Sequence, residues 1–453
     1  MQVVYERCCG LDVHKKTVVA CLITVSPATA ERRKELRHFR TTTQELLRLA
    51  DWLTEASCSH VAMEATGVYW RPIFNLLEGL FELLVVNAQH IKAVPGRKTD
   101  TKDAEWIADL LQHGLLRGSF IPETLQRELR ELTRYRASLI QDRVRMVNRL
   151  QKTLEDTNLK LGDVVTDIMG KSARAMLEAL LDGQTDPHLL ANLARGRMKA
   201  KRAQLEEALV GTLKAHHRFL LSEQLVHIDT LDEAITRVSQ EIEQRMGASE
   251  PASKQRSPSG ASAPPPTTMP GEGTIDESNA EQGPEVLTWK QAVDLLDTIP
   301  GINQRAAEGI LAEIGIDMSR FPSAKHLASW AGMCPGNHES AGKRLSGKAR
   351  KGSLWLRRLL MEVAHGATHK KGSYLKALYW RIAARRGHKK ALFAVAHAIL
   401  VIIYYLLSRK VSYEDLGENH FDERERQAVE KRLVRRLEKL GYEVSLQAIS
   451  PAA

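Results

Sequence analysis

The sequence predicts an α/β amino-terminal domain followed by a largely helical remainder. Two observations predict this class: strand-type apolar runs alternate with helical patterns in residues 1–122, and long charged helical patterns fill residues 123–246. Residues 286–410 predict a second helical domain. Between them, residues 247–285 contain a Pro-Pro-Pro run and too few apolar residues to fold, which predicts a disordered linker. Residues 411–453 read as a charged helical tail to which the sequence assigns no function.

Strands are expected in the first domain within residues 3–23, as a hairpin, and at residues 60–63 and 82–87. Helical periodicity covers residues 43–55, 70–79 and 102–113. Strands that alternate with helices form layered sheets, and in such folds the site lies at the carboxyl ends of the strands.

The middle region repeats apolar residues at a spacing of three and four. Its first stretch carries Leu125, Leu129, Leu132, Leu139, Met146 and Leu150, with Arg136 and Arg143 in the remaining seam positions. Residues 221–242 repeat the pattern after a shorter helical piece. Two such helices predict a long antiparallel coiled-coil arm, a device that more often serves dimerisation or reach than chemistry.

Composition and charge point to a polyanionic partner. The formal charge is +10, and residues 325–390 hold sixteen Lys or Arg against two acids, so this segment carries +14 and the rest about −4. A concentrated excess favours a nucleic-acid surface over a merely solvated basic face. Five scattered cysteines, no signal pattern, and an apolar run at 391–407 broken by His397 predict a cytoplasmic protein with no membrane span.

Four carboxylates stand out in the first quarter: Asp12, Glu64, Asp100 and Asp103. Two end strand patterns, and two lie three residues apart where a helix begins, so they can converge on one point. Gathered acids repel, and Mg²⁺, which prefers oxygen ligands, relieves that repulsion while it bridges to phosphate. The alternative is that each acid caps or solvates its own segment.

The basic region contains two further motifs. Residues 295–303, with Pro300 and Gly301, predict a helix-hairpin-helix whose amide groups bind phosphate, although a plain helical hairpin fits as well. Ser340 lies in a Gly-bounded loop near Lys343, Arg344, Lys348 and Lys351. Local sequence favours a phosphate contact over a nucleophile for such a serine, because its hydroxyl needs activation to attack phosphorus.

With these motifs together, the chain resembles the DEDD transposases of bacterial insertion sequences, the one-ten insertion-sequence family of RNA-guided recombinases. The resemblance rests on four sequence motifs: Gly-Leu-Asp-Val-His-Lys at 10–15, Met-Glu-Ala-Thr-Gly at 63–67, Lys-Thr-Asp-Thr-Lys-Asp-Ala at 98–104 and Glu-Ser-Ala-Gly-Lys at 339–343. The resemblance implies a RuvC-like, RNase H-type first domain that binds Mg²⁺ through Asp12, Glu64, Asp100 and Asp103. It also implies that Ser340, rather than the neighbouring Ser346 or Ser353, attacks DNA and becomes linked to it.

The same resemblance implies a composite site shared between subunits, hence a dimer, or a tetramer in synapsis. It also implies a structured noncoding guide RNA as partner beside the DNA of element ends and target. The leading hypothesis is therefore a Mg²⁺-dependent DNA transposase with a serine nucleophile. Two alternatives stay open: a RuvC-like junction endonuclease that uses metal-activated water, and a non-catalytic architectural DNA binder.

Overall fold

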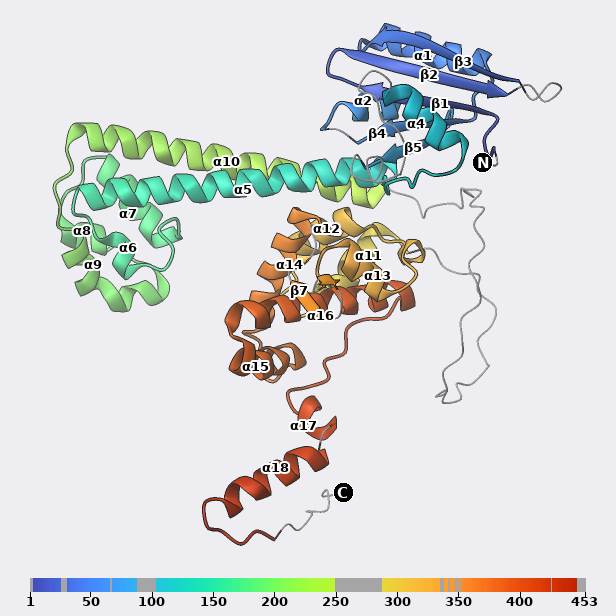
Figure 1. Cartoon of the computed structure of the whole chain (residues 1–453). Coiled ribbons are helices and arrows are strands. Elements are labelled where there is room, and N and C mark those ends of the chain that lie inside the picture. The colour runs from blue at the N-terminus through green and yellow to red at the C-terminus, as the bar shows by residue number, and fades with distance from the viewer. Residues whose placement is uncertain are drawn as a thin grey trace. The chain divides into compact units, whose positions relative to one another are not determined.

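The structure is a computed structural model that divides into two compact units, Met1–Glu123 and Thr124–Ala453 (Figure 1). It describes residues 3–25, 31–65, 67–87, 103–248, 287–334, 349, 352–424 and 426–445. Only the backbone is described for residues 338–340, 343–346 and 427–429. The predicted linker therefore lies almost entirely outside the described residues, as do Asp100, Lys348 and Lys351.

The first unit is built on a five-stranded mixed sheet with strand order β3-β2-β1-β4-β5. The strands are β1 (Arg7–Val13), β2 (Thr17–Val25), β3 (Arg32–Arg40), β4 (His60–Glu64) and β5 (Glu82–Val86). Strand β2 runs antiparallel to its neighbours β1 and β3, and β4 and β5 run parallel to β1. The mixed α/β class and the opening hairpin are thus confirmed.

Strand β3 was absent from the sequence prediction, and its composition explains why. It is an edge strand in which Phe39 is the one buried side chain. Edge strands carry charges that discourage pairing with other chains, so the apolar alternation typical of a strand is missing. On one face of β3, Arg32 and Lys34 pair with Asp109, and Lys34 Nζ lies 2.9 Å from the Asp109 carboxylate.

Helices cover both faces of this sheet. Helices α1 (Thr43–Glu55) and α2 (Trp70–Leu77) pack on one face with Leu11 and Met63, while α4 (Asp103–Gln112) packs on the other with Cys8 and Ala62. Successive strand residues point to opposite faces, which is why β1, apolar on both sides, lies at the centre. The helix predicted at 43–55 is confirmed at both ends.

Helix α4 crosses β1 at very close range, and Gly10 makes this possible. A Cβ at Gly10 would lie 2.4 Å from the Ala104 carbonyl oxygen and 2.4 Å from the Ala108 amide nitrogen. Any larger residue would therefore have to displace the backbone of α4. The glycine fixes the start of α4 against the middle of β1.

The second unit opens with two long helices, α5 (Thr124–Asp156) and α10 (Ala215–Ala248), which lie side by side (Figure 1). They run antiparallel, since Arg245 pairs with Glu128 at one end and Gln224 bonds Thr153 at the other. Their far ends join a small helical body with its own apolar core. Its elements are α6 (Leu161–Val164), α7 (Lys171–Leu181), α8 (Pro187–Ala191), the 3-10 helix η1 (Gly196–Lys201) and α9 (Arg202–Ala208).

The arginines in the seam of α5 have specific partners. Arg136 is buried and donates to Glu308 at 2.6 Å, and Arg143 pairs with Asp232 of α10 at 2.5 Å. Leu129 belongs to the same apolar cluster as Ile242, near the other end of the pair. Helix α5 therefore contributes to three apolar clusters in succession, through Leu129, Leu139 and Leu150. The cluster that contains Leu129 is the main core of the second unit.

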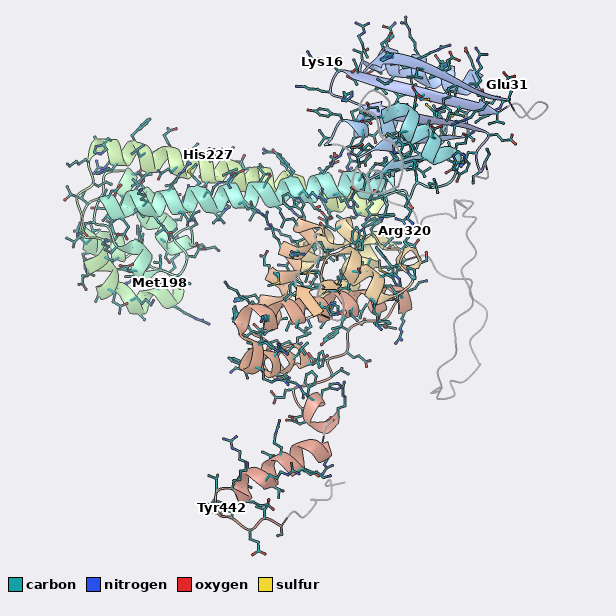
Figure 2. All side chains as sticks on the ribbon, viewed as in Figure 1. Lys16, Glu31, Met198, His227, Arg320 and Tyr442 are labelled. Carbon is teal, nitrogen blue, oxygen red and sulfur yellow. The ribbon has the colours of Figure 1, made fainter. Side chains whose placement is uncertain are left out.

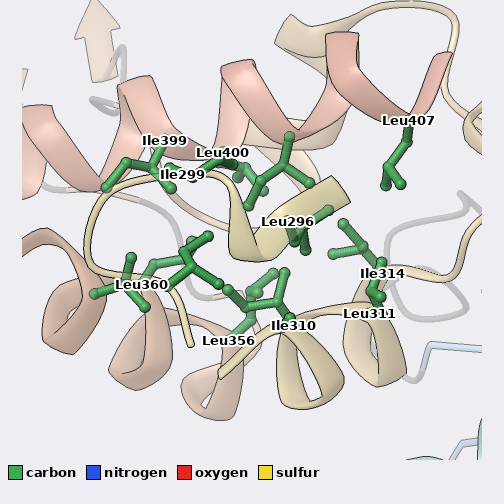
Figure 3. Packing of buried hydrophobic residues seen from close by; sticks show 14 of the residues in the cluster. Leu296, Ile299, Ile310, Leu311, Ile314, Leu356, Leu360, Ile399, Leu400 and Leu407 are labelled. Carbon is green, nitrogen blue, oxygen red and sulfur yellow. The ribbon is translucent and has the colours of Figure 1, made fainter. Parts of the chain in front are cut away.

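That main core is a helical cluster around α16 (Figure 3). Its elements are α11 (Trp289–Asp297), α12 (Gln304–Ile314), η2 (Met318–Arg320), α13 (Ala324–Trp330), α14 (Leu354–Ala367), α15 (Tyr374–Arg386) and α16 (His388–Arg409). Among the described residues, α16 alone is long and apolar enough to cross a membrane. Nine of its side chains between Ala391 and Leu407 are buried, and His397 donates to the Met333 carbonyl at 2.9 Å. Burial in this core agrees with the sequence interpretation.

The tail begins after α16 and continues through α17 (His420–Arg424) and α18 (Arg426–Glu438). Its first part is tied to α15: Asp415 accepts from the Tyr374 amide at 2.8 Å, and Phe421 stacks on the Tyr374 ring. Beyond this contact most of the described side chains are exposed, as at Tyr442, which is labelled in Figure 2. The tail thus has one anchored part and one exposed helix.

Candidate functional site

Two of the predicted acids lie at the carboxyl ends of neighbouring parallel strands. Leu11 of β1 pairs with Met63 of β4, so Asp12 and Glu64 are the next residues along each strand. Cys8 and Ala62 pack toward α4, and Asp12 and Glu64 follow them at even spacing, so they project to the same face. The strand register therefore places these two carboxylates next to each other.

A third acid joins them from the covering helix. Asp103 is the first residue of α4, directly before Ala104, whose carbonyl oxygen lies over Gly10 of β1. We call this region, formed by Asp12, Glu64 and Asp103, the acidic edge. Asp100 lies outside the described residues.

The acidic edge is partly open to solvent. The side chain of Asp12 is 25% exposed, and His14 Nε2, two residues further along the chain, lies 3.2 Å from Asp12 Oδ2. Sequence reasoning did not single out His14. The feature that could have identified His14 is its position two residues after Asp12. This spacing places both side chains on one face when the strand direction continues.

The donor set at this edge fits a divalent metal ion. Carboxylate oxygens are the ligands that hard divalent cations prefer. No group of three or more His, Cys, Asp or Glu side chains among the described residues stands ready to hold a metal ion. Asp12, Glu64 and Asp103 therefore supply suitable ligand types from neighbouring elements, without forming a ready-made metal site.

The predicted helix-hairpin-helix falls on α11, the turn at residues 298–303, and α12. Gly301 has φ +86°, and a Cβ there would lie 2.5 Å from the Ala367 amide nitrogen of α14. Asn303 caps α12 by accepting from the Ala306 amide at 2.9 Å. The turn is thus packed on α14, and one amide at the start of α12 is already satisfied, so phosphate binding at Gly301 stays a prediction.

Ser340 was expected in a loop, and the structure corrects this. It ends β6 (His338–Ser340), which pairs with β7 (Lys343–Ser346) in a short antiparallel hairpin, with Ser340 opposite Lys343. Strands of three and four residues leave too little apolar alternation for the sequence to reveal them. The side chains of Ser340, Lys343 and Arg344 lie outside the described residues, so the hairpin gives their backbone positions only.

The described residues before and after this hairpin pack against the helical core. On the incoming side, Arg357 donates to the Gly332 carbonyl at 2.8 Å, next to the Met333 carbonyl that accepts from His397. On the outgoing side, a Cβ at Gly352 would lie 2.2 Å from the Ala331 carbonyl oxygen. The described residues that flank the hairpin, 331–333 and 352, therefore pack closely against each other.

Ser353, a neighbour considered beside Ser340, has a structural role. Its hydroxyl caps α14 by accepting from the Leu356 amide and donates to Glu313 Oε2 at 3.0 Å. Glu313 is buried and receives two hydrogen bonds from Arg134, at 2.7 and 2.9 Å. Burial lowers the pKa of the adjacent Arg130 to about 10, and the Glu313 charge opposes that shift. Ser353 is thus committed to a buried ionic network.

Both parts of the chain match models of transposases, which gives its class. A DEDD-type model described as "Transposase" matches residues 9–159, a range that includes all four predicted acids. A second model, described as "Transposase IS116/IS110/IS902 family", matches residues 293–380, which include Gly301 and Ser340. Together the two ranges cover more than half of the chain. The chain belongs to this IS116/IS110/IS902 family of transposases.

Individual relatives match over shorter stretches. The pilin gene-inverting protein of Moraxella bovis is 54% identical over 46 residues, which is 10% of this chain and 14% of the relative. The insertion element IS116 uncharacterized 44.8 kDa protein of Streptomyces clavuligerus is 41% identical over 92 residues, 17% of this chain and 22% of the relative. The matched segments thus span less than a quarter of either relative.

Proposed function

We propose that this protein is a divalent-metal-dependent DNA transposase that cuts and exchanges strands through a serine nucleophile. The observation that carries the proposal is the acidic edge, where Asp12 and Glu64 end adjacent parallel strands and Asp103 begins the helix that crosses Gly10. The sheet order agrees with a RuvC-like, RNase H-type domain. The family match and the gene-inverting relative support DNA as the substrate.

The acids would hold the metal and thereby position the scissile phosphate. Asp12, Glu64 and Asp103, joined by Asp100, supply oxygen ligands for Mg²⁺, and the ion would stabilise charge that develops on the phosphoryl oxygens. His14 beside Asp12 orients that carboxylate. The sheet register and the Gly10 contact keep these residues at one edge before any ligand arrives.

Ser340 would carry out the covalent step. Its hydroxyl oxygen attacks phosphorus, a P–O bond of the strand breaks, and the released strand end takes a proton as a free hydroxyl. A hydroxyl of the partner strand then attacks the phosphoserine and restores both the phosphodiester and the serine. Lys343, Arg344, Lys348 and Lys351 would contact the strand backbone, and Gly301 a phosphate. Because bond energy is conserved, the exchange needs no nucleotide cofactor.

The acids and the serine lie on different units of the chain, which leaves open a site completed by a second subunit, as the family resemblance implies. We propose that a homo-oligomer, a dimer or a tetramer, brings a serine hairpin to an acidic edge, with the α5–α10 pair as a coiled-coil arm between subunits. A noncoding guide RNA would supply sequence recognition by base pairing while the protein contacts backbone and shape.

The decisive test compares wild type with Ser340→Ala. Each protein is incubated with element-end DNA, the element's RNA and Mg²⁺, and protein–DNA adducts are separated under denaturing conditions. Wild type should form an adduct, and Ser340→Ala should form none while it still binds DNA. Normal cleavage by Ser340→Ala would instead establish the endonuclease that uses metal-activated water.

Ser346→Ala is the matched control, because Ser346 lies in the same hairpin, on β7. It should retain adduct formation. Combined substitution of Asp12, Glu64, Asp100 and Asp103 by Asn or Gln should abolish both cleavage and adduct. If the wild type neither cleaved DNA nor formed an adduct, and this variant bound DNA as the wild type does, the architectural DNA binder would be favoured.

A further inference from the structure

The corner where α15 ends and α16 begins is an exposed cationic surface. Residues 384–390 are all exposed and include Arg385, Arg386, Lys389 and Lys390. The sequence contains no acidic residue between Glu362 and Glu414. Cations gathered without acids attract a polyanion, and we call this surface the basic corner.

An exposed tryptophan adjoins the basic corner. Trp380 of α15 is 61% exposed, and of the seven tryptophans, all of which lie among the described residues, it alone is exposed. The residues one helical turn away on its face are Lys376 and Ala384, and the small alanine leaves room beside the indole. Tryptophan is enriched at binding interfaces, so an exposed indole beside a cationic surface marks a candidate contact for a ligand.

The ring is held in place rather than loosely attached. Tyr379 packs edge-on against Trp380 with ring centroids 5.1 Å apart, and the Tyr379 hydroxyl lies 2.7 Å from His388 Nδ1 at the start of α16. These contacts join the end of α15 to α16 through three aromatic side chains. The basic corner therefore presents an ordered aromatic platform.

The tail supports α15 from its other end. Leu375 is the one fully buried residue of α15, so the helix has a small apolar anchor. Asp415 accepts from the Tyr374 amide, and Phe421 lies under Arg381, whose guanidinium is 4.9 Å from the ring centroid. These contacts give residues 415–421 a role: they fix the helix that carries Trp380.

We propose that the basic corner binds an unpaired stretch of a nucleic-acid strand, with a base stacked on Trp380 and adjacent phosphates on Arg385, Arg386, Lys389 and Lys390. A base inside a duplex has both faces covered by its neighbours, whereas an unpaired base offers a face to an aromatic ring. The inference rests on the proposed function, which supplies single strands during exchange. It concerns a surface that mostly lies beyond the family match at residue 380.

The test measures binding of the full-length protein to fluorescein-labelled oligothymidine, oligouridine and a duplex of equal length by anisotropy. Trp380→Ala should weaken single-strand binding by about five- to one-hundred-fold, the usual loss for one stacked base. The duplex affinity should change less than about twofold, and Trp380→Phe should recover most of the loss. Comparison of the two single-strand probes tells whether DNA or RNA occupies the corner.

The salt dependence separates stacking from charge. Trp380→Ala should leave the slope of log affinity against log salt unchanged, whereas Arg386→Ala with Lys389→Ala should make the slope shallower by about 0.7 for each phosphate that the protein no longer neutralises. Phe219→Ala is the matched control, since Phe219 is an aromatic residue on α10 that is 65% exposed and distant in sequence from the corner. It should bind like wild type.

Equal losses on strand and duplex, or no loss with Trp380→Ala, would overturn the inference. Adduct formation through Ser340 is measured in parallel. Normal adducts with unchanged strand binding would refute the basic corner alone, whereas missing adducts in the wild type would refute the proposed function.

Discussion

The carboxylates of the two units differ in what surrounds them. Glu308 and Glu313 of the second unit are buried, and each has an arginine partner at 2.6–2.7 Å. Asp12 of the first unit is partly exposed, and its partner, His14, is itself exposed to solvent. A buried carboxylate with a full set of donors stabilises the fold, whereas an open carboxylate at a sheet edge is available to a ligand.

The largest expected effect is the loss of stability when a buried ion pair of the second unit is broken. Glu308→Gln leaves the Arg136 guanidinium buried without its counter-charge, so the free energy of unfolding of the second unit should fall by about 3–5 kcal/mol. Asp12→Asn should change the stability of the first unit by less than about 0.5 kcal/mol while it abolishes activity. Chemical denaturation followed by circular dichroism measures both.

Two variants check this interpretation. Arg136→Met combined with Glu308→Leu should recover most of the lost stability, because it removes both charges together. If Asp12→Asn destabilised the protein as much as Glu308→Gln does, Asp12 would be a structural residue and the acidic edge would lose its proposed role.

A smaller loss of stability, accompanied by a loss of cleavage activity, is expected from a substitution at the acidic edge. Gly10→Ala places a Cβ 2.4 Å from backbone atoms of α4, which must shift, at a cost of about 1–3 kcal/mol. The shift moves Asp103 relative to Asp12, so metal-dependent cleavage should fall by more than the stability loss explains. Gly118→Ala is the control, since its nearest contact would be an ordinary 3.8 Å from Leu84. Equal activity in the two variants would contradict the assigned role of Gly10.

The smallest effect for a single group concerns the buried thiols near the amino-terminal ends of β1 and β4. Burial raises the pKa of Cys9 well above its ordinary value, and raises that of Cys8 and Cys58 to about 12. Above pH 9 the unfolded chain loses thiol protons that the folded chain keeps, so stability should fall as pH rises, and these thiols contribute no slope below pH 8. Each contributes at most about 1.4 kcal/mol per pH unit.

Denaturation midpoints at pH 8 and pH 10 check this, with Cys9→Ala as the variant that should flatten the decline. A midpoint that rose between these pH values would show that other groups dominate. Thiol reagents in native buffer should label the partly exposed Cys334 before the four buried cysteines.

The sequence correctly predicted the elements whose apolar spacing reflects which faces are buried. The helix at residues 43–55, strands β4 and β5, and the core helix α16 follow from apolar spacing, because each buries one face or both. It failed at β3, whose charged residues face solvent, and at the serine hairpin, whose strands are too short to show a period.

The site was predicted in part for similar reasons. Strand ends and a helix start placed Asp12, Glu64 and Asp103 on one edge, since topology follows from the order of elements. Pairs such as Arg136 with Glu308 join residues 172 positions apart, and no local pattern reports them. The exposure of Trp380 likewise depends on how α15 packs, which its weakly amphipathic sequence does not reveal.

The continuity of α5 restricts how related chains vary in length. A single helix, α5, connects the main core at Leu129 with the small helical body of α6–α9 at Leu150, which we call the distal body. Inserting one residue into α5 between Leu139 and Leu150 would rotate the distal body by about 100° relative to the main core. Insertions and deletions between Leu139 and Leu150 should therefore occur as near-whole turns, matched by equal changes in α10. The distance between the distal body and the main core would then change in discrete steps.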